Sequence, residues 1–390
     1  MGRVSTAASP QVTIFCRVVK FLLGYTLLMR RSAAPTLKDV AEIAGVSTML
    51  ASVVLNGARS TTRVSPVSRL RIQEAAAQLG YRRNALAHGL TRNLLDTIGV
   101  VTDINGAELN LYFLEIFYGI LEAATEYRQN TTVFSINNWE NDADRILQFF
   151  DGRVDGIIFI APVTLPLPLL QSLQYHTPFV TLHSNIRNNE LTDIDIDDES
   201  GAYLMVQYLL AQGHRRIAHF TGSQEIRGAR LRLQGYCRAL EDARIPRDDS
   251  LIIPCIYSLN SGRACMEQFL EETPAAQLPT AIFCANDTLA YGCVEVLAAH
   301  GIRIPEQISV AGFDDSLMAR LTQPPLTTIC QPFRRMGQRA VERLLPKIRN
   351  DISPTSKDAD SPIPFRRLPD TDTEVFDVEL IVRDSVRPFP

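Results

Sequence analysis

The sequence has little of what marks a secreted, metal-binding or disulfide-rich protein. Its 390 residues include seven cysteines, no two of which form a CxxC pair, and several lie in apolar runs such as AIFCAND around Cys284. We therefore expect buried, reduced thiols in a cytoplasmic protein rather than a disulfide framework or a zinc site. We expect neither a metal nor a cofactor.

The chain also lacks an uncharged apolar run of the about 20 residues that a membrane span requires. Its most apolar stretch, residues 12–28, is interrupted by Arg17 and Lys20. We interpret residues 1–34 as an N-terminal extension and favour Met29 as the natural start, with a signal peptide ending near SAA at 32–34 as the alternative. We expect no association with a membrane.

No motif of an enzyme is present. There is no P-loop, no GxGxxG after a strand and no nucleophile–base arrangement, so we expect no enzymatic activity. The acidic run DIDIDDE at 193–199 lacks the glycine and glutamate of a calcium loop, and its alternation predicts a strand with the acids in solvent. The two acids of GFDD at 312–315 point apart in an extended chain and indicate a turn at a strand end.

Charge is distributed unevenly along the chain. Residues 30–93 carry ten Lys or Arg against three acids, a net charge of +7, whereas residues 94–390 carry a net charge of -14. A basic head on an acidic body predicts a polyanionic partner at one end of the chain only.

The basic head has the pattern of a helix-turn-helix. Thr36 is placed to cap a first helix, with Asp39 three residues later, and Gly45 ends it. Ser47 is placed to cap a second helix running to about Leu55, and a third is expected between Ser65 and Gly80. Between Gly45 and Gly57, however, there is no lysine or arginine, which is unusual for a helix that enters the major groove.

The rest of the chain alternates short apolar strands with helical stretches. Strands are expected at 97–101, 131–136, 156–161, 179–182, 217–222, 251–256, 281–286 and 308–313, and the run 375–383 alternates like a last strand. Such a pattern, repeated twice, predicts an α/β core of two doubly wound lobes behind an all-α headpiece. Ligands of parallel sheets bind beyond the carboxyl ends of the strands, so a small-molecule site is expected between the lobes.

Seven blocks, in order from residue 36 to about 385, resemble the lactose-repressor (LacI/GalR) family. They include TLKDVAEIAGVS, RIQEAAAQLGY, GHRRIAHFTG, AIFCANDTLAYG and ISVAGFDD. The resemblance implies a helix-turn-helix headpiece at 35–81, a hinge at 82–95 and a periplasmic-binding-protein-like core at 96–390. The first lobe is expected at 96–184 and 325–350, and the second at 190–322 and 374–385.

The resemblance implies that the start of the second helix reads bases. Leu50, Ala51 and Val53 replace the threonine, valine and arginine of the family pattern. Because an arginine at 53 would contact guanine and valine touches only a thymine methyl, we expect a shifted or AT-leaning half-site. The hinge is expected to fold on DNA and to insert Leu90 into the minor groove, with Arg83 in place of the usual proline. The residues expected at the DNA are Thr36, Leu37, Ser47, Thr48, Met49, Ser52, Val53, Asn56, Arg59, Arg63, Asn84, Ala87 and Leu90.

The resemblance also implies effector-binding residues between the lobes. Arg232 matches the arginine that holds ligand hydroxyls or carboxylates, and Asp287 matches an acceptor for sugar hydroxyls, although a helix N-cap is the alternative for Asp287. Asn260, Asn110, Tyr112 and Phe113 are further candidates. The register of NLYF at 110–113 is unsettled, and Phe113 fits a core position equally well.

The sequence therefore predicts a transcriptional regulator, a repressor, that binds a palindromic DNA operator as a homodimer under the control of a small molecule. A sugar or sugar derivative is the expected effector, with purines and nucleosides as alternatives. An exported sugar-binding protein is a weaker alternative because it would lack the headpiece, and a headpiece that has lost specific binding is another.

Overall fold

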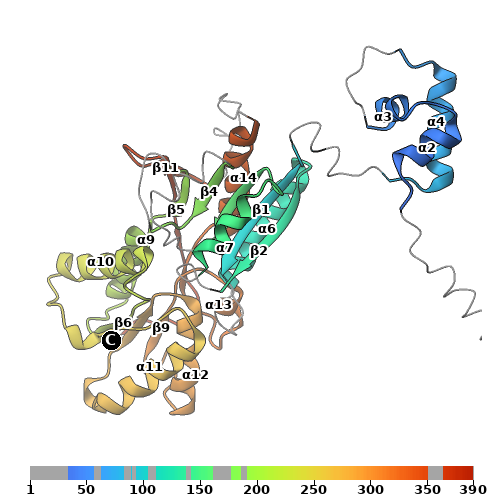
Figure 1. Ribbon diagram of the computed structural model, residues 1–390. Coiled ribbons are helices and arrows are strands. Elements are labelled where there is room, and N and C mark those ends of the chain that lie inside the picture. The colour runs from blue at the N-terminus through green and yellow to red at the C-terminus, as the bar shows by residue number, and fades with distance from the viewer. Residues whose placement is uncertain are drawn as a thin grey trace, which may run out of the picture. The chain divides into compact units, whose positions relative to one another are not determined.

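The computed structural model describes residues 34–56, 63–82, 89, 94–103, 111–137, 142–160, 177–185, 191–349 and 363–389. The chain divides into two compact units, residues 1–95 and residues 96–390. The first unit contains a headpiece of three described helices, and the second contains two sheets with their covering helices (Figure 1).

The headpiece helices begin at the residues that the local sequence predicts. They are α2 (Leu37–Ala44), α3 (Thr48–Asn56) and α4 (Pro66–Leu79). Thr36 and Asp39 form a capping box at the start of α2, in which the Thr36 N–H donates to the Asp39 carboxylate at 2.7 Å. Ser65 caps α4 with its side chain alone, which accepts from the Ser68 N–H at 3.1 Å.

A small apolar core holds the three helices together, and it consists of Val40, Ala41, Ala44, Ala51, Ile72, Ala75 and Ala76. Gly45 ends α2 with a φ of 66°, a left-handed conformation that a side chain disfavours. This turn sets α2 and α3 at 110° to each other. Within the described residues no single helix is long and apolar enough to span a membrane, and α2 and α3 reach the required length and composition only as this bent pair.

The first lobe of residues 96–390 is built on a seven-stranded sheet of order β11-β12-β5-β4-β3-β1-β2. Neighbouring strands are parallel except β11 and β12. The strands are β1 (Thr97–Asp103), β2 (Asn130–Ile136), β3 (Gly156–Ile160), β4 (Phe179–Leu182), β5 (Asp193–Ile196), β11 (Phe365–Arg367) and β12 (Thr373–Phe376).

Two helices pack against each other over this sheet, α6 (Leu111–Glu126) and α14 (Phe333–Arg349). Gly119 and Gly337 allow their close approach, because a β-carbon on Gly119 would lie 2.0 Å from the Arg334 carbonyl oxygen. A short helix, α7 (Ala143–Leu147), follows β2 along the chain and leads into a 3-10 turn, η1 (Gln148–Phe150).

The second lobe has a four-stranded parallel sheet of order β7-β6-β8-β9. Among its helices, α9 packs on α10 and α11 packs on α12. The elements are β6 (Ile217–Phe220), β7 (Ile252–Ile253), β8 (Ala281–Cys284), β9 (Ser309–Ala311), α9 (Asp198–Ala211), α10 (Arg227–Asp242), η2 (Asp249–Leu251), α11 (Leu259–Glu272), η3 (Ala275–Gln277), α12 (Asp287–Ala299) and α13 (Leu317–Leu321).

The lobe boundaries predicted from the sequence are wrong for two strands. Residues 190–322 and 374–385 were expected in the second lobe, but β5 and β12 pair with each other inside the first lobe's sheet. The run 375–383 also forms parts of two strands, since β12 is followed by β13 (Glu379–Ile381), which pairs antiparallel with β10 (Thr328–Cys330). Pairing between strands so far apart in the chain leaves no local signal.

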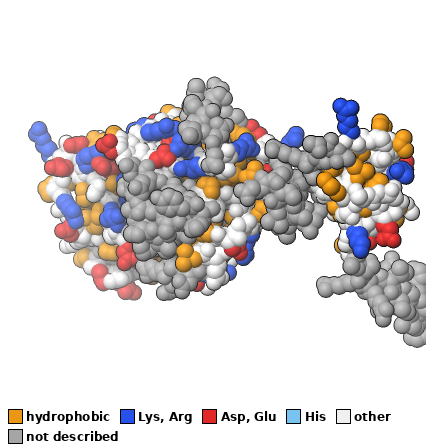
Figure 2. All heavy atoms as spheres, turned by 45° about the horizontal axis from the view of Figure 1, so that its top comes forward, with side chains coloured by type: hydrophobic (Ala, Val, Ile, Leu, Met, Phe, Trp, Pro, Cys, Tyr) orange, Lys and Arg blue, Asp and Glu red, His pale blue; other side chains and the backbone are white. Residues whose placement is uncertain are grey.

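One apolar cluster extends through both lobes. It includes Ile98 and Ile158 of the first sheet, Phe283 of the second sheet and Met336 of α14. The described cysteines are all free, and Cys255, Cys284 and Cys293 are buried, as expected for reduced thiols. Basic and acidic side chains are interspersed over the described face of the second unit in Figure 2.

Candidate functional site

The start of α3 presents uncharged side chains. Thr48 and Met49 are exposed, Met49 to 65%, whereas Ser52 and Val53 are half-buried. Positions one helical turn apart share a face, so Thr48 lies above Ser52 and Met49 above Val53. This face offers two hydroxyls and two apolar side chains, and the family pattern has an arginine at the position of Val53.

Several other predicted DNA residues hold the headpiece itself in shape. Thr36 is engaged in the capping box, and Leu37 packs against the headpiece core. Ser47 accepts a hydrogen bond from the Leu50 N–H at 3.2 Å, and Asn56 donates to Ser52 Oγ at 3.2 Å. Arg63 is exposed before α4. Arg59, Asn84, Ala87 and Leu90 lie outside the described residues.

A second group of functional side chains is buried between the two lobes, around Arg232 of α10. The Arg232 side chain is 7% exposed, and its Nε donates to Asp198 Oδ1 at 2.8 Å. A second guanidinium nitrogen donates to the Ala285 carbonyl oxygen and lies 3.8 Å from Asp314 Oδ1. The guanidinium also stacks 3.7 Å from the centre of the Phe313 ring. Arg232 therefore already has two carboxylate partners.

Three of the five acids in the run 193–199 are buried rather than in solvent, which corrects the prediction for them. Asp193, Asp195 and Asp198 are each no more than 2% exposed. The reason is that β5 is an interior strand with β4 and β12 on either side, and α14 packs against it. Asp193 accepts from Thr181 Oγ1 at 2.7 Å, and Asp198 is the first residue of α9.

Asp195 connects the two lobes. Its carboxylate accepts from Arg227 of α10 at 3.0 Å and lies 3.5 Å from His183 Nδ1 at the end of β4. The Arg227 backbone N–H also donates to Asn185 of the first lobe at 2.8 Å. These contacts hold the N-terminus of α10 against the carboxyl ends of β4 and β5.

Four buried polar atoms beside these charges lack a hydrogen-bond partner among the described residues: the hydroxyls of Tyr112, Thr221 and Tyr257 and the side-chain carbonyl of Gln331. The Tyr112 ring meets the His183 and Phe333 rings edge-on, each at 5.3 Å. Tyr257 lies under Arg232, 5.7 Å from ring centre to guanidinium. Gln331 donates its amide N–H to Asp314 at 2.6 Å, which leaves its carbonyl oxygen available. Buried polar atoms are rarely left unsatisfied, so this group indicates a place for a polar ligand.

Burial governs the protonation of the acids in this site. It raises the pKa of Asp314 well above its usual range, against the opposing effect of Arg232. Burial also raises the pKa of Asp198, again opposed by Arg232. Burial and the neighbouring Asp195 raise the pKa of the Tyr112 hydroxyl, so it remains protonated and able to donate.

Asp287 is fully buried and is engaged with the protein. Its two oxygens accept from Thr328 Oγ1 and from the Ser316 N–H, each at 2.7 Å. The N-cap of α12 is the preceding residue, Asn286, so the alternative N-cap role for Asp287 is wrong by one position. Burial raises the pKa of Asp287 to about 7, partly offset by these hydrogen bonds.

The remaining predicted effector residues are more scattered. Asn260 is exposed in the first turn of α11 and accepts from Arg263 at 3.3 Å. Phe113 stacks on Phe117 at 5.2 Å and packs against the main core, which is the core role left open above. Asn110 lies outside the described residues. Of the predicted set, Arg232 and Tyr112 lie at the buried polar group.

Sequence reasoning missed the partners of Arg232. Asp198 and Asp314 were interpreted as a solvent-facing acid and a turn residue, and Gln331, Tyr257 and Arg227 were not singled out. Each of Asp195, Asp198 and Asp314 lies at or just beyond the carboxyl end of a strand, where ligands of parallel sheets bind. That rule, applied to every strand end, would have identified them.

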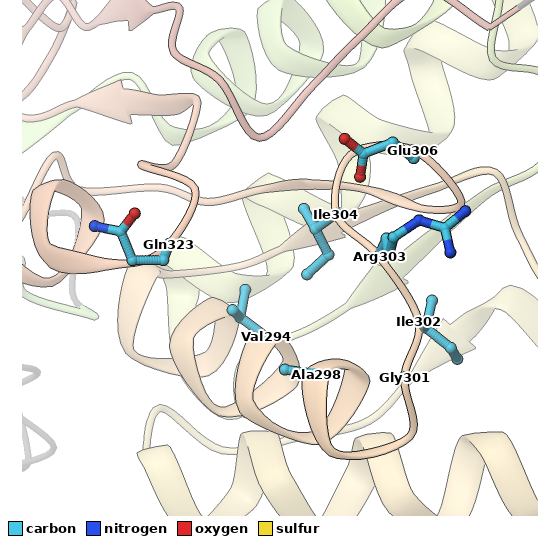
Figure 3. Close-up of a pocket in the computed structure, with 8 residues that line it drawn as sticks. All are labelled: Val294, Ala298, Gly301, Ile302, Arg303, Ile304, Glu306 and Gln323. Atoms are coloured by element: carbon cyan, nitrogen blue, oxygen red, sulfur yellow. The ribbon is translucent and has the colours of Figure 1, made fainter.

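A separate hollow lies on the second lobe, away from these residues. It has a volume of about 330 Å³ and is lined by the second half of α12, residues 301–306 and Gln323 (Figure 3). Its lining contains none of the predicted effector residues.

Comparison with known proteins agrees with the two-part organisation of the chain. Residues 36–84 match the model of bacterial regulatory proteins of the lacI family, and residues 206–367 match a periplasmic binding protein-like domain. The HTH-type transcriptional repressor PurR of Vibrio atlanticus is 35% identical over 320 residues, 81% of this chain and 92% of the relative. PurR of Vibrio vulnificus is 33% identical and covers 90% of this chain and 98% of its own.

Solved structures give the same result. A lac repressor dimer bound to operator and an anti-inducer superposes with a TM-score of 0.73 at 29% identity, covering 90% of this chain and 99% of its own. The regulator CelR in complex with cellobiose has a TM-score of 0.64 at 28% identity, with the same coverage. With its helix-turn-helix headpiece and its two-lobed α/β core, this chain belongs to the lacI family of bacterial regulatory proteins.

Proposed function

We propose that this protein is a transcriptional repressor whose affinity for a DNA operator is controlled by a small polar molecule bound between the two lobes of residues 96–390. It acts as a homodimer on a palindromic site, so that two α3 helices enter successive major grooves. The observation that carries the proposal is the pairing, in one chain, of an exposed reading face on α3 with a buried group of unpartnered polar atoms at the strand ends.

The face of α3 that carries Thr48, Met49, Ser52 and Val53 decides which base pairs the helix prefers. Because Met49 and Val53 are apolar, they favour contact with thymine methyl groups over bidentate contact with guanine. Positive charges outside α3, such as Arg63, supply contacts to phosphates that do not depend on sequence. The operator is therefore expected to be AT-leaning opposite Met49 and Val53.

The buried polar group accounts for control by a ligand. A molecule that satisfies the Tyr112 hydroxyl from the first lobe and the Tyr257 hydroxyl from the second changes how the lobes close. The similar regulators support this role, since the lac repressor structure contains operator and anti-inducer and the CelR structure contains cellobiose. A sugar derivative or a purine fits the hydrogen-bonding pattern, and both are retained as effector classes.

The protein is expected to act without catalysis and in the cytoplasm, where bacterial operators are accessible. Its relatives are named as transcriptional repressors, which supports this expectation.

The test begins with selection of binding sites from random duplex DNA by the full-length protein. We expect a palindrome with AT pairs at the positions opposite α3 and an affinity that falls steeply with salt. Weak binding to all duplexes alike would contradict the proposal.

Two variants separate base reading from phosphate binding. Met49→Ala is expected to weaken binding to the selected palindrome by about tenfold and to relax the preference at one base pair in each half-site. Arg63→Gln is expected to weaken binding to all sequences equally and to reduce the slope of log affinity against log salt by about 1. Competition gels across a salt series measure both, and identical behaviour of the two variants would refute the assignment.

A further inference from the structure

The charged side chains between the lobes are already paired with one another. The described cluster contains two guanidiniums, Arg227 and Arg232, and three carboxylates, Asp195, Asp198 and Asp314. Arg232 lies 2.8 Å from Asp198, and Arg227 lies 3.0 Å from Asp195. Each guanidinium of the cluster is therefore already paired with a carboxylate.

The atoms in the cluster that still need partners are uncharged. Thr221 is 1% exposed and Gln331 is 4% exposed, and each has a buried oxygen without a hydrogen-bond partner. The hydroxyls of Tyr112 and Tyr257 are also buried without a hydrogen-bond partner. The Gln331 carbonyl oxygen only accepts, while the three hydroxyls both donate and accept, so they match a ligand rich in O–H or N–H groups.

Both guanidiniums of this described cluster are already paired, so an anionic ligand finds no unpaired positive charge in it. To reach Arg232 it must displace the Asp198 carboxylate, which then loses its partner while 1% exposed. Leaving a buried carboxylate unpaired is strongly unfavourable. Binding of a neutral ligand needs neither change.

We propose that Asp198, by neutralising Arg232, makes this a site for an uncharged effector with several hydrogen-bond donors and excludes phosphorylated or carboxylated molecules. Asp198 is thus a specificity-determining residue. This inference rests on the proposed function and deepens it, because it chooses the charge class of the ligand that occupies the interlobe site.

Inorganic phosphate is the probe for the exclusion of anions. The thermal unfolding of the full-length protein is followed in increasing phosphate, with ionic strength held constant by chloride. We expect no phosphate-dependent rise in the Tm of the wild type. Asp198→Asn frees Arg232 and is expected to bind phosphate at least about tenfold more tightly, seen as a saturable rise in Tm.

A surface variant controls for non-specific effects. Asp249→Asn also removes the carboxylate partner of an arginine, Arg247, but its side chain is 80% exposed. It is expected to show no saturable rise in Tm. If Asp198→Asn does not fold, Asp198→Ser, which removes the same carboxylate and leaves a smaller polar side chain, serves in its place.

Two results would overturn the proposal: a saturable rise in the wild-type Tm with phosphate, or no gain of phosphate binding in either interlobe variant over Asp249→Asn. Retention of operator DNA is measured on the same preparations. If the expected charge selectivity is not found but the protein binds operator DNA, this inference alone is refuted. If the wild type does not bind operator DNA, the proposed function is refuted.

Discussion

The ionisable side chains of Arg232, Asp198 and Asp314 are buried close together. Each depends on the others to compensate its charge. Their exposed fractions are 5%, 1% and 8%. A buried charge without a partner costs several kcal/mol, so removal of any one of them leaves the others uncompensated. At the scale of single residues, the proposed interlobe site is therefore a set of mutually dependent ion pairs.

His219 illustrates burial without a charged partner. It lies in β6, stacks on the Phe283 and Tyr236 rings, and its Nδ1 is 3.0 Å from the Phe283 carbonyl oxygen. Burial lowers the pKa of His219 to about 4 from its usual value near 6.5. The folded protein thus keeps His219 neutral at a pH at which the unfolded chain takes up a proton.

This difference predicts a loss of stability in acid. A histidine with a lowered folded pKa contributes stability that is fully present above pH 6.5 and is lost as the pH falls toward 4. His219→Phe keeps the stacking and removes the titration. Between pH 8 and pH 5 the free energy of unfolding of the variant is expected to gain about 2 kcal/mol relative to the wild type. Urea unfolding at the two pH values measures it, and a constant difference would contradict the assignment.

Among the elements, α14 carries an unusual buried ion network. Arg339 is 0% exposed and makes two hydrogen bonds to Glu374 of β12, at 2.6 and 2.9 Å, and one to Glu342 at 3.1 Å. Arg335 pairs with Glu342 through both of its terminal nitrogens. The network ties α14 to β12, the strand that the sequence alone placed in the other lobe.

Arg339→Met is expected to lower the free energy of unfolding by about 3–5 kcal/mol, because it leaves the fully buried Glu374 short of its main partner. The matched control is Arg334→Met on the same helix. Arg334 is 55% exposed and pairs with Glu115 and Glu122 at the surface, so its loss is expected to cost less than about 1 kcal/mol. Denaturant unfolding of both variants measures the contrast, and equal costs would refute it.

At the scale of the whole molecule, the two lobes of residues 96–390 share an apolar core and are also joined by polar contacts. Arg227 contributes two of them, its side chain to Asp195 and its backbone to Asn185. If an effector acts as proposed, by changing lobe closure, these contacts are the ones that such a change would break or form.

Arg227→Met is therefore expected to favour a more open arrangement of the lobes in the ligand-free protein. Small-angle X-ray scattering should record a larger radius of gyration than in the wild type. Arg238→Met is the control, because Arg238 lies on the same helix but pairs with Glu199 inside the second lobe. An unchanged radius in Arg227→Met, or an equal change in the control, would mean that this pair does not hold the lobes together.

The sequence by itself determined the helices of the headpiece and the order of the strands along the chain. Thr36, Gly45, Ser65 and Gly80 act within a few residues of themselves, through caps and left-handed turns, so their effect is visible in a short window. The expected strand segments each contain a strand for a similar reason, since an apolar run between turns is a local property.

Only the tertiary structure decided which strands share a sheet and which acids are buried. The pairing of β5 with β12 joins segments on either side of the whole second lobe, and it turns DIDIDDE from a predicted surface strand into an interior one. Asp198 reaches Arg232 across 34 positions of the sequence, and the partners of a buried charge are fixed by such long-range packing. Burial and pairing are properties of the assembled sheets, and no local pattern of residues specifies them.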